Sequence, residues 1–188
     1  MAEKVVSLIE EMRENGENMR LWKNIGLSSE CIERLGVIDD VSGLEKALAC
    51  STILDLIPKY DVPRYALSIL QKQKAWLESA GEETEYLTLE TIQEDIVELE
   101  EYINYEEISN EEFMSKYSKF LKFDPIQRTP MWEENYCRWE QECDKRLGDT
   151  PRCMGFCYEY WSTFAAVLAE EGVEWKSPSQ MNPRVLFD

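Results

Sequence analysis

The sequence predicts an all-α protein, a compact bundle of roughly six to eight helices with an irregular C-terminal tail docked on it. Three observations support this prediction. Apolar residues recur at helical spacing along most of the 188 residues. Residues that start and end helices separate these stretches from one another. No stretch alternates β-branched and polar residues in the way that predicts a strand, and no Asn-Gly or Asp-Gly turn joins two such stretches.

The first helix is expected at the N-terminus. Val5, Leu8 and Met12 recur at intervals of three and four residues, so they share one face of a helix. This helix should stop near Asn15-Gly16, because glycine is unfavourable inside a helix and both residues suit a turn. A short turn is expected next, over residues 29–35.

Two further helices are expected before residue 81. Residues 42–45 read Ser-Gly-Leu-Glu, a capping box in which serine and glutamate satisfy free backbone N–H groups at the start of a helix. That helix should end at Pro58, because proline cannot continue it. Pro63 suits the first turn of the following helix, and Gly81 suits its end, where a left-handed residue is favoured.

The 41 residues between Lys74 and Lys116 form an acidic window, with 14 carboxylates and no positive charge. The chain has 38 acids and 20 bases, a net charge of −18, so this window holds most of the excess. Thr88 suits the cap of a helix inside the window, expected at residues 86–105. Its apolar residues keep a three-four spacing and predict one buried stripe: Leu89, Ile92, Ile96, Leu99 and Ile103.

The C-terminal half is expected to hold further helices and a connector. Residues 109–112 read Ser-Asn-Glu-Glu, a second capping box, and residues 123–128 are expected to form the connector. Thr129 should cap the next helix. A last long helix is expected from about residue 153 to residue 171, because its apolar residues again recur at helical spacing.

The tail after residue 175 combines a Ser-x-x-Gln cap, a proline at the first helical position and a terminating Asn-Pro. These backbone-directing residues, together with several large apolar groups, predict that the tail docks on the body. One domain over residues 1–188 is predicted. The alternative is a subdivision into 1–81 and 109–188, joined through the acidic helix at 86–105.

Composition excludes several kinds of function. Histidine is absent, which removes Ser-His-Asp and Cys-His catalysis and histidine-based zinc hydrolysis. Net acidity argues against binding to nucleic acid or to anionic membranes, because both attract basic surfaces. No apolar run reaches the length of a membrane span, and the N-terminus lacks the features of a signal peptide. A cytoplasmic protein without membrane or direct nucleic-acid contact is expected.

The six cysteines are expected to be free thiols, because a chain of this length without a leader does not resemble a disulfide-stabilised miniprotein. Cys153 and Cys157 are four residues apart and would share one side of a single helix. Cys137 and Cys143 are six apart and point in different directions, so a four-thiolate zinc site is not expected. No glycine-rich phosphate loop and no EF-hand occurs. No cofactor, metal site or catalytic residue is predicted.

The acidic window has two interpretations. Its carboxylates are either the solvated face of a surface helix or a surface kept for a basic protein partner. The second explains why acids lie at the end of the helix, where the helix dipole disfavours negative charge, and form like-charge pairs four residues apart. The predicted partner-binding residues are Glu90, Glu94, Asp95, Glu98, Glu101, Glu106 and Glu107.

The C-terminal half offers a second kind of site. Its aromatic residues are expected to form a core, and Tyr158, Trp161 and Trp175 are candidates for an aromatic groove. Carboxylates among these aromatics keep a glycosidase-like enzyme open as an alternative, since that chemistry needs only two acids. They are Glu133, Glu134, Glu140 and Glu159.

The leading hypothesis is a small acidic cytoplasmic protein that acts by binding and engages a basic protein partner through its acidic helix. Proteins of the immunity, inhibitor or antagonist kind share this profile of size, acidity and missing catalytic motifs. The alternatives are the carboxylate-dependent enzyme and a structural subunit of a larger assembly. The sequence leaves the oligomeric state open.

Overall fold

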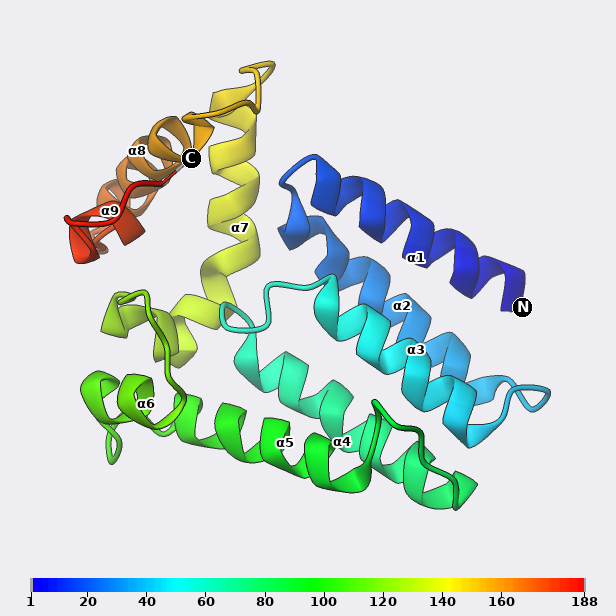
Figure 1. Ribbon diagram of the computed structural model, residues 1–188. Coiled ribbons are helices and arrows are strands. Elements are labelled where there is room, and N and C mark those ends of the chain that lie inside the picture. Colours follow the sequence, from blue (N-terminus) through cyan, green and yellow to red (C-terminus); the bar gives the residue numbers. More distant parts are fainter. Residues whose placement is uncertain (1, 188) are drawn as a thin grey trace. The chain divides into compact units, whose positions relative to one another are not determined.

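The computed structural model describes residues 2–187, and every regular element within them is helical (Figure 1). In this range nine α-helices and two 3₁₀ helices follow one another, and the α-helices α6 (Asn110–Lys116) and α9 (Pro178–Met181) are short. The predicted all-α fold is therefore confirmed. None of the helices described is both long and apolar enough to cross a membrane.

The chain divides into two compact units, with the boundary between Ile103 and Asn104. The first contains α1 to α5 and the second α6 to α9. The acidic helix, expected at 86–105 as the element that would join two subdomains, packs inside the first unit against α4. The single domain expected over residues 1–188 stays a prediction.

The first unit is built from five helices: α1 (Ala2–Glu17), α2 (Asn24–Val37), α3 (Gly43–Asp55), α4 (Pro63–Ala80) and α5 (Leu89–Ile103). Helix α1 packs on α2, and α4 contacts both α3 and α5 (Figure 1). Their apolar faces close one core. Its most deeply buried members include Leu8, Met12, Cys31, Ala47, Cys50, Ile53, Ala66, Ile69 and Leu77.

The predicted caps start α3 and α5, whereas α3 ends at Asp55, three residues before the predicted stop at Pro58. Ser42 Oγ accepts a hydrogen bond from the Glu45 backbone N–H at 3.2 Å, and a Glu45 carboxylate oxygen accepts one from the Ser42 N–H at 2.9 Å. Thr88 Oγ1 caps α5 by accepting a backbone N–H of the first turn at 3.1 Å. Helix α4 begins at Pro63 and ends before Gly81, whose φ is 66°.

One prediction about the first unit is wrong. The turn expected over residues 29–35 lies inside the helix α2. The buried face of α2 includes Asn24 and Ser28, two polar residues that interrupt the apolar pattern from which helices are recognised. Helix α1 ends close to its predicted boundary: it passes Gly16 by one residue, and the backbone turns at Met19, where φ is 52°.

The second unit contains α6, α9 and a longer pair, α7 (Pro130–Leu147) and α8 (Phe156–Glu170), which pack against each other. Helix α8 begins three residues later than the expected start at Cys153. The cause is Gly155, whose φ of 85° is incompatible with a helix. Cys153 therefore does not lie on one helix with Cys157, and the two thiols lose the arrangement in which they would share a metal.

Aromatic rings fill the core between α7 and α8. Trp132 is at its centre, with its ring centroid 5.6 Å from that of Trp139, 5.8 Å from that of Phe164 and 6.2 Å from that of Trp175. The 3₁₀ helix Pro125–Arg128 occupies the predicted connector and leads into α7. Most of these aromatics are thus core residues, as expected.

The C-terminal tail docks on the second unit, as predicted. Asn182 Nδ2 donates to the Lys122 carbonyl at 2.8 Å, and Asn182 Oδ1 accepts from the Lys122 N–H at 2.8 Å. The Lys176 N–H donates to Asp124 Oδ2 at 2.8 Å. Because each of these bonds joins residues more than 50 positions apart, the tail is part of the folded unit.

Candidate functional site

Four glutamates of helix α5 lie on the side opposite its buried apolar residues. Ile92, Ile96 and Leu99 are buried in the first unit. At about 100° per residue, the four glutamates of the predicted site that lie on this helix fall within an arc of about 80°, away from that buried side. The α5 acidic face consists of Glu90, Glu94, Asp95, Glu98 and Glu101.

Two of the five carboxylates of the α5 acidic face lack a neutralising base in the described chain. Glu90 and Glu94 lie one turn apart and form no ion pair with any residue that the structure describes. Lys74 reaches α5 from α4, but its Nζ donates to the amide oxygen of Gln93, at 2.8 Å, and not to a carboxylate of α5. The last turn of α5 carries no base, although the helix dipole favours a cation there. The charges of Glu90 and Glu94 therefore repel each other across one turn, which lowers helix stability.

In the second unit, glutamates at the end of α8 form ion pairs with arginines of α7. Arg146 on α7 forms a two-pronged pair with Glu170 on α8, with N–O distances of 2.8 and 2.7 Å. Arg138 forms a similar pair with Glu171, and this guanidinium, together with the Trp139 indole N–H, lowers the pKa of Glu171 to about 2. Glu170 and Glu171, at the end of α8, are thus each paired with an arginine of α7. Glu90 and Glu94 of α5 have no such partner in the described chain.

Glu106 and Glu107, the other two predicted partner-binding residues, lie beyond the boundary between the units. Both are exposed, and Glu107 Oε2 accepts a hydrogen bond from Asn104 Nδ2 at 2.9 Å. The structure therefore brings together the five predicted residues of the α5 acidic face.

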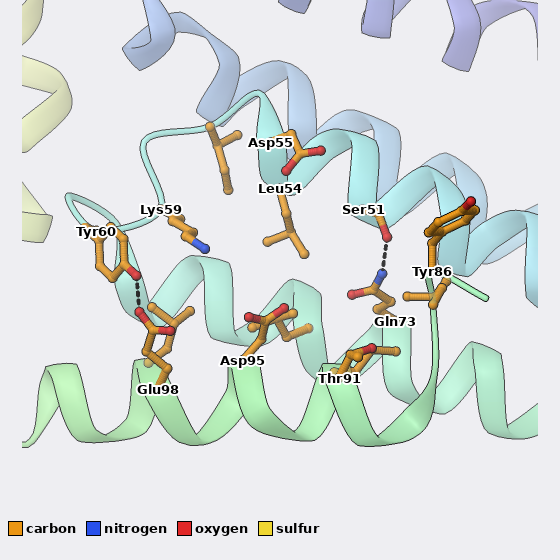
Figure 2. Close-up of a pocket in the computed structure, with 15 residues that line it drawn as sticks. Ser51, Leu54, Asp55, Lys59, Tyr60, Gln73, Tyr86, Thr91, Asp95 and Glu98 are labelled. Carbon is orange, nitrogen blue, oxygen red and sulfur yellow. Dashed lines mark hydrogen bonds between the residues drawn. The ribbon is translucent and has the colours of Figure 1, made fainter. Parts of the chain in front are cut away.

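A pocket of about 360 Å³ opens beside the α5 acidic face (Figure 2). Asp95 and Glu98 line it from α5, Asp55 lines it from α3, and Lys59 comes from the loop after α3. We call it the α3–α5 pocket. Its apolar lining consists of Leu54, Ile57, Leu70, Leu87, Ile92 and Leu99.

Gln73 of α4 also lines the α3–α5 pocket and is only 2% exposed. Its Nε2 donates to the Ala47 carbonyl at 2.9 Å and lies 2.6 Å from Ser51 Oγ. Because a carbonyl oxygen can only accept, the first bond decides which way the amide is turned. Its Oε1 accepts no hydrogen bond from residues 2–187, and it points away from Ser51 into the pocket (Figure 2).

Tyr60 forms one end of the pocket (Figure 2). Its hydroxyl donates a hydrogen bond to Glu98, and its ring packs on that of Tyr102 with centroids 5.1 Å apart. The Lys59 ammonium lies 5.3 Å from the Tyr60 ring centroid, a cation–π distance. The loop after α3 is thereby attached to α5, and the Glu98 carboxylate is held beside Tyr60 in the pocket lining.

The pocket residues Asp55, Lys59 and Gln73 were not predicted from the sequence. Gln73 could have been noticed in the sequence, because it lies in the apolar stripe of α4 between Leu70 and Leu77. A polar residue at such a buried position predicts a specific hydrogen bond. Asp55 and Lys59 carry none. They are exposed or half-buried residues near a helix end, and only the folded chain brings them to α5.

The residues predicted as an aromatic groove lie in two places. Tyr158 and Trp161 line a hollow of about 350 Å³, with their ring centroids 5.6 Å apart. Phe187 of the tail packs edge-on against Trp161, at 5.1 Å. Trp175 belongs to the aromatic core, 5.3 Å from Phe164, and its buried Nε1 has no hydrogen-bond partner among the described residues.

The carboxylates of the alternative enzyme have unlike surroundings. Glu140 is 6% exposed and accepts a hydrogen bond from the Tyr160 hydroxyl, whereas Glu134 and Glu159 are exposed. None of the four carboxylates named for that enzyme lines the hollow beside Trp161. Within residues 2–187, no group of three or more His, Cys, Asp or Glu side chains is placed to hold a metal ion.

All six cysteines are free thiols, and their surroundings predict their reactivity. Burial raises the pKa of Cys31 to about 11 and those of Cys50 and Cys143 to about 12, so very little thiolate forms near neutral pH. Cys153 is exposed. Iodoacetamide at about pH 8 should therefore label Cys153 well before these three, as measured by peptide mass spectrometry.

In urea the protection should disappear, and all six thiols should react at similar rates. This control separates burial from any intrinsic difference between the peptides. Labelling of Cys50 or Cys143 as fast as Cys153 in the native protein would contradict the core described above.

The α5 acidic face and the α3–α5 pocket together are the candidate site of the first unit. Comparison with known proteins found no match: no protein-family model, no curated protein and no solved structure aligns significantly with this chain.

Proposed function

We propose that this is a small cytoplasmic binding protein without enzymatic activity, whose α5 acidic face engages a basic protein partner. The observation that carries the proposal is the set of carboxylates gathered on one side of a folded helix, with Glu90 and Glu94 unpaired within the described chain. An inhibitor, antagonist or immunity protein directed against a basic target is the form of this function that we favour.

Closely spaced negative charges lower the stability of the helix that carries them. Acids near a helix C-terminus and like charges four residues apart each destabilise a helix by some tenths of a kcal/mol. Stability alone therefore gives no reason for them, whereas a cationic partner does. Ile92, Ile96 and Leu99 pack α5 into the core, so the carboxylates of α5 are already positioned in the free protein. Little conformational entropy is therefore lost when a partner binds.

The test uses two charge-reversed variants of the full chain. E90K/E94K reverses two exposed carboxylates one turn apart on α5. E10K/E14K reverses two exposed carboxylates one turn apart on α1, in the same unit, and changes the net charge by the same amount. Glu98 is left intact, because it accepts a hydrogen bond from the loop after α3 and its loss would disturb the fold.

Wild type and both variants are used to capture proteins from native cytosol at low salt, followed by a salt wash and mass spectrometry. We expect a basic protein that wild type and E10K/E14K retain, that E90K/E94K loses, and that salt releases, because screening weakens exposed charge pairs. Circular dichroism confirms equal folding of the variants. Equal retention by the two variants, or retention that salt does not reduce, would show the proposal to be wrong.

A further inference from the structure

We infer that the hollow beside Tyr158 and Trp161 binds a proline-rich segment of a partner protein in the polyproline II conformation. We call this cavity of about 350 Å³ the α8 hollow, because α8 supplies both aromatic side chains. The segment around α9 also lines it, with Ser177, Ser179 and Gln180. The α8 hollow lies wholly in the second unit, so its ligand is distinct from the partner proposed for the α5 acidic face.

Two aromatic rings form a corner of the α8 hollow. The ring centroids of Tyr158 and Trp161 are 5.6 Å apart and the ring planes meet at 79°, so the rings are two walls and not a stack. Tyr158 is 46% exposed, and Phe187 packs edge-on against Trp161 at 5.1 Å, which holds that ring in place. Aromatic-lined grooves receive proline rings, and a proline-rich segment is extended before it binds, so little conformational entropy is lost.

The lining of the α8 hollow is uncharged, in contrast to the composition of the chain. Among the described residues that line it, none is Asp, Glu, Lys or Arg, although the chain carries 38 acids and 20 bases. An ionic ligand would lose hydration there without gaining a counter-charge. A proline-rich segment carries no charge on its prolines and has no such cost.

Two side-chain N–H groups of the residues that line the α8 hollow favour a ligand that accepts hydrogen bonds. Gln180 Oε1 accepts from the Ser177 N–H at 2.8 Å, so the orientation of the amide is fixed and its Nε2 is a donor. Neither Gln180 Nε2 nor Trp161 Nε1 has a hydrogen-bond partner within the described chain. Each proline of a ligand offers a carbonyl oxygen and no N–H. The partial positive charges of the two N–H groups are therefore complementary to such a segment.

A neutral sugar is another uncharged ligand that packs on aromatic rings. Its hydroxyls both donate and accept, and the hydroxyls of Tyr158, Ser162 and Ser179 would answer either way. The amide of Gln180 and the indole of Trp161 decide between the two ligands, because their free groups only donate. They favour the proline-rich segment, and a sugar serves as a comparison probe in the test.

The experiment is an NMR titration of the ¹⁵N-labelled full chain with blocked hexaproline. A blocked Gly-Ser peptide of the same length and maltotriose are the comparison probes. Hexaproline should shift the Trp161 indole N–H and the Gln180 side-chain amide to saturation, and the flexible Gly-Ser peptide should bind at least about fivefold more weakly. The Kd should differ by less than about twofold between low and physiological salt, because the hollow is uncharged. Saturation of these signals by maltotriose and not by hexaproline would overturn the assignment.

Variants locate the binding. Y158A removes one wall of the corner and should raise the Kd of hexaproline at least about tenfold. Y86A is the matched control, because Tyr86 is 87% exposed and lies in the first unit, and it should change the Kd by less than about twofold. Q180E keeps the oxygen that accepts from Ser177 and loses the donor, so it should raise the Kd about fivefold. Circular dichroism verifies that the variants fold alike. Equal Kd values for Y158A and Y86A, or hexaproline shifts that leave out Trp161, would show the inference to be wrong.

Discussion

Replacement of Asn24 by leucine should destabilise the first unit by about 3 kcal/mol. Asn24 is 0% exposed. Its Nδ2 donates to the carbonyl of Met12 on α1 at 2.8 Å and to that of Leu56, after α3, at 2.7 Å, and its Oδ1 accepts from Asn15 at 3.0 Å. One amide therefore joins three segments of the unit. Leucine has a similar size but leaves both carbonyls without this donor, inside the protein.

Hydrogen exchange followed by mass spectrometry of the full chain measures this loss locally. At the expected magnitude, the most protected amides of α1, α2 and α3 should exchange about 100-fold faster in N24L than in wild type. N15A is the control, because it removes only one of the three hydrogen bonds, from a half-buried position, and should cost about 1 kcal/mol. Exchange in N24L no faster than in N15A would contradict the role given to Asn24.

Replacement of Gly43 by alanine should destabilise the first unit by about 2 kcal/mol. Gly43 is the first residue of α3, and a Cβ added there would lie 2.4 Å from the backbone oxygen of Trp76 and 2.8 Å from Ser79 Oγ, both on α4. The start of α3 and the end of α4 therefore approach to a distance that only glycine allows. Because the closest atom belongs to the backbone of a packed helix, the helices themselves would have to move apart.

Gly36→Ala is the matched control for Gly43→Ala. Gly36 lies in α2, and a Cβ added there meets nothing within 4 Å. Alanine should stabilise that helix by about 0.5 to 1 kcal/mol, the usual gain over glycine inside a helix. Thermal unfolding of both variants should therefore give shifts of opposite sign. A shift of the same sign in both would contradict the close approach of α3 and α4.

Structural features that depend only on residues close together in the sequence were predictable. The capping boxes at Ser42 and Ser109 and the cap at Thr129 act within one turn, and the structure forms all three. The stripe of α5 was predictable because its apolar residues follow one period without interruption. The docked tail was predictable from its proline and capping residues, although its partner Lys122 was not.

Features that depend on distant contacts were not predictable. Helix α2 was missed because Asn24 and Ser28 occupy buried positions, and each forms a hydrogen bond with a distant part of the chain, Leu56 and Tyr65 respectively. The α3–α5 pocket was missed for the same reason. Gln73 is 26 residues from Ala47, the residue that fixes its amide, and nothing near Gln73 in the sequence shows where α3 lies.

The central claim is that the α5 acidic face, and not the net charge of the chain, binds a basic partner. Its most direct test is the Kd of the captured partner for wild type, E90K/E94K and E10K/E14K at low and at physiological salt. At low salt E90K/E94K should bind at least about tenfold more weakly than wild type, E10K/E14K should stay within about threefold, and the gap should narrow as salt rises. Equal Kd values for the two variants at low salt would contradict the claim.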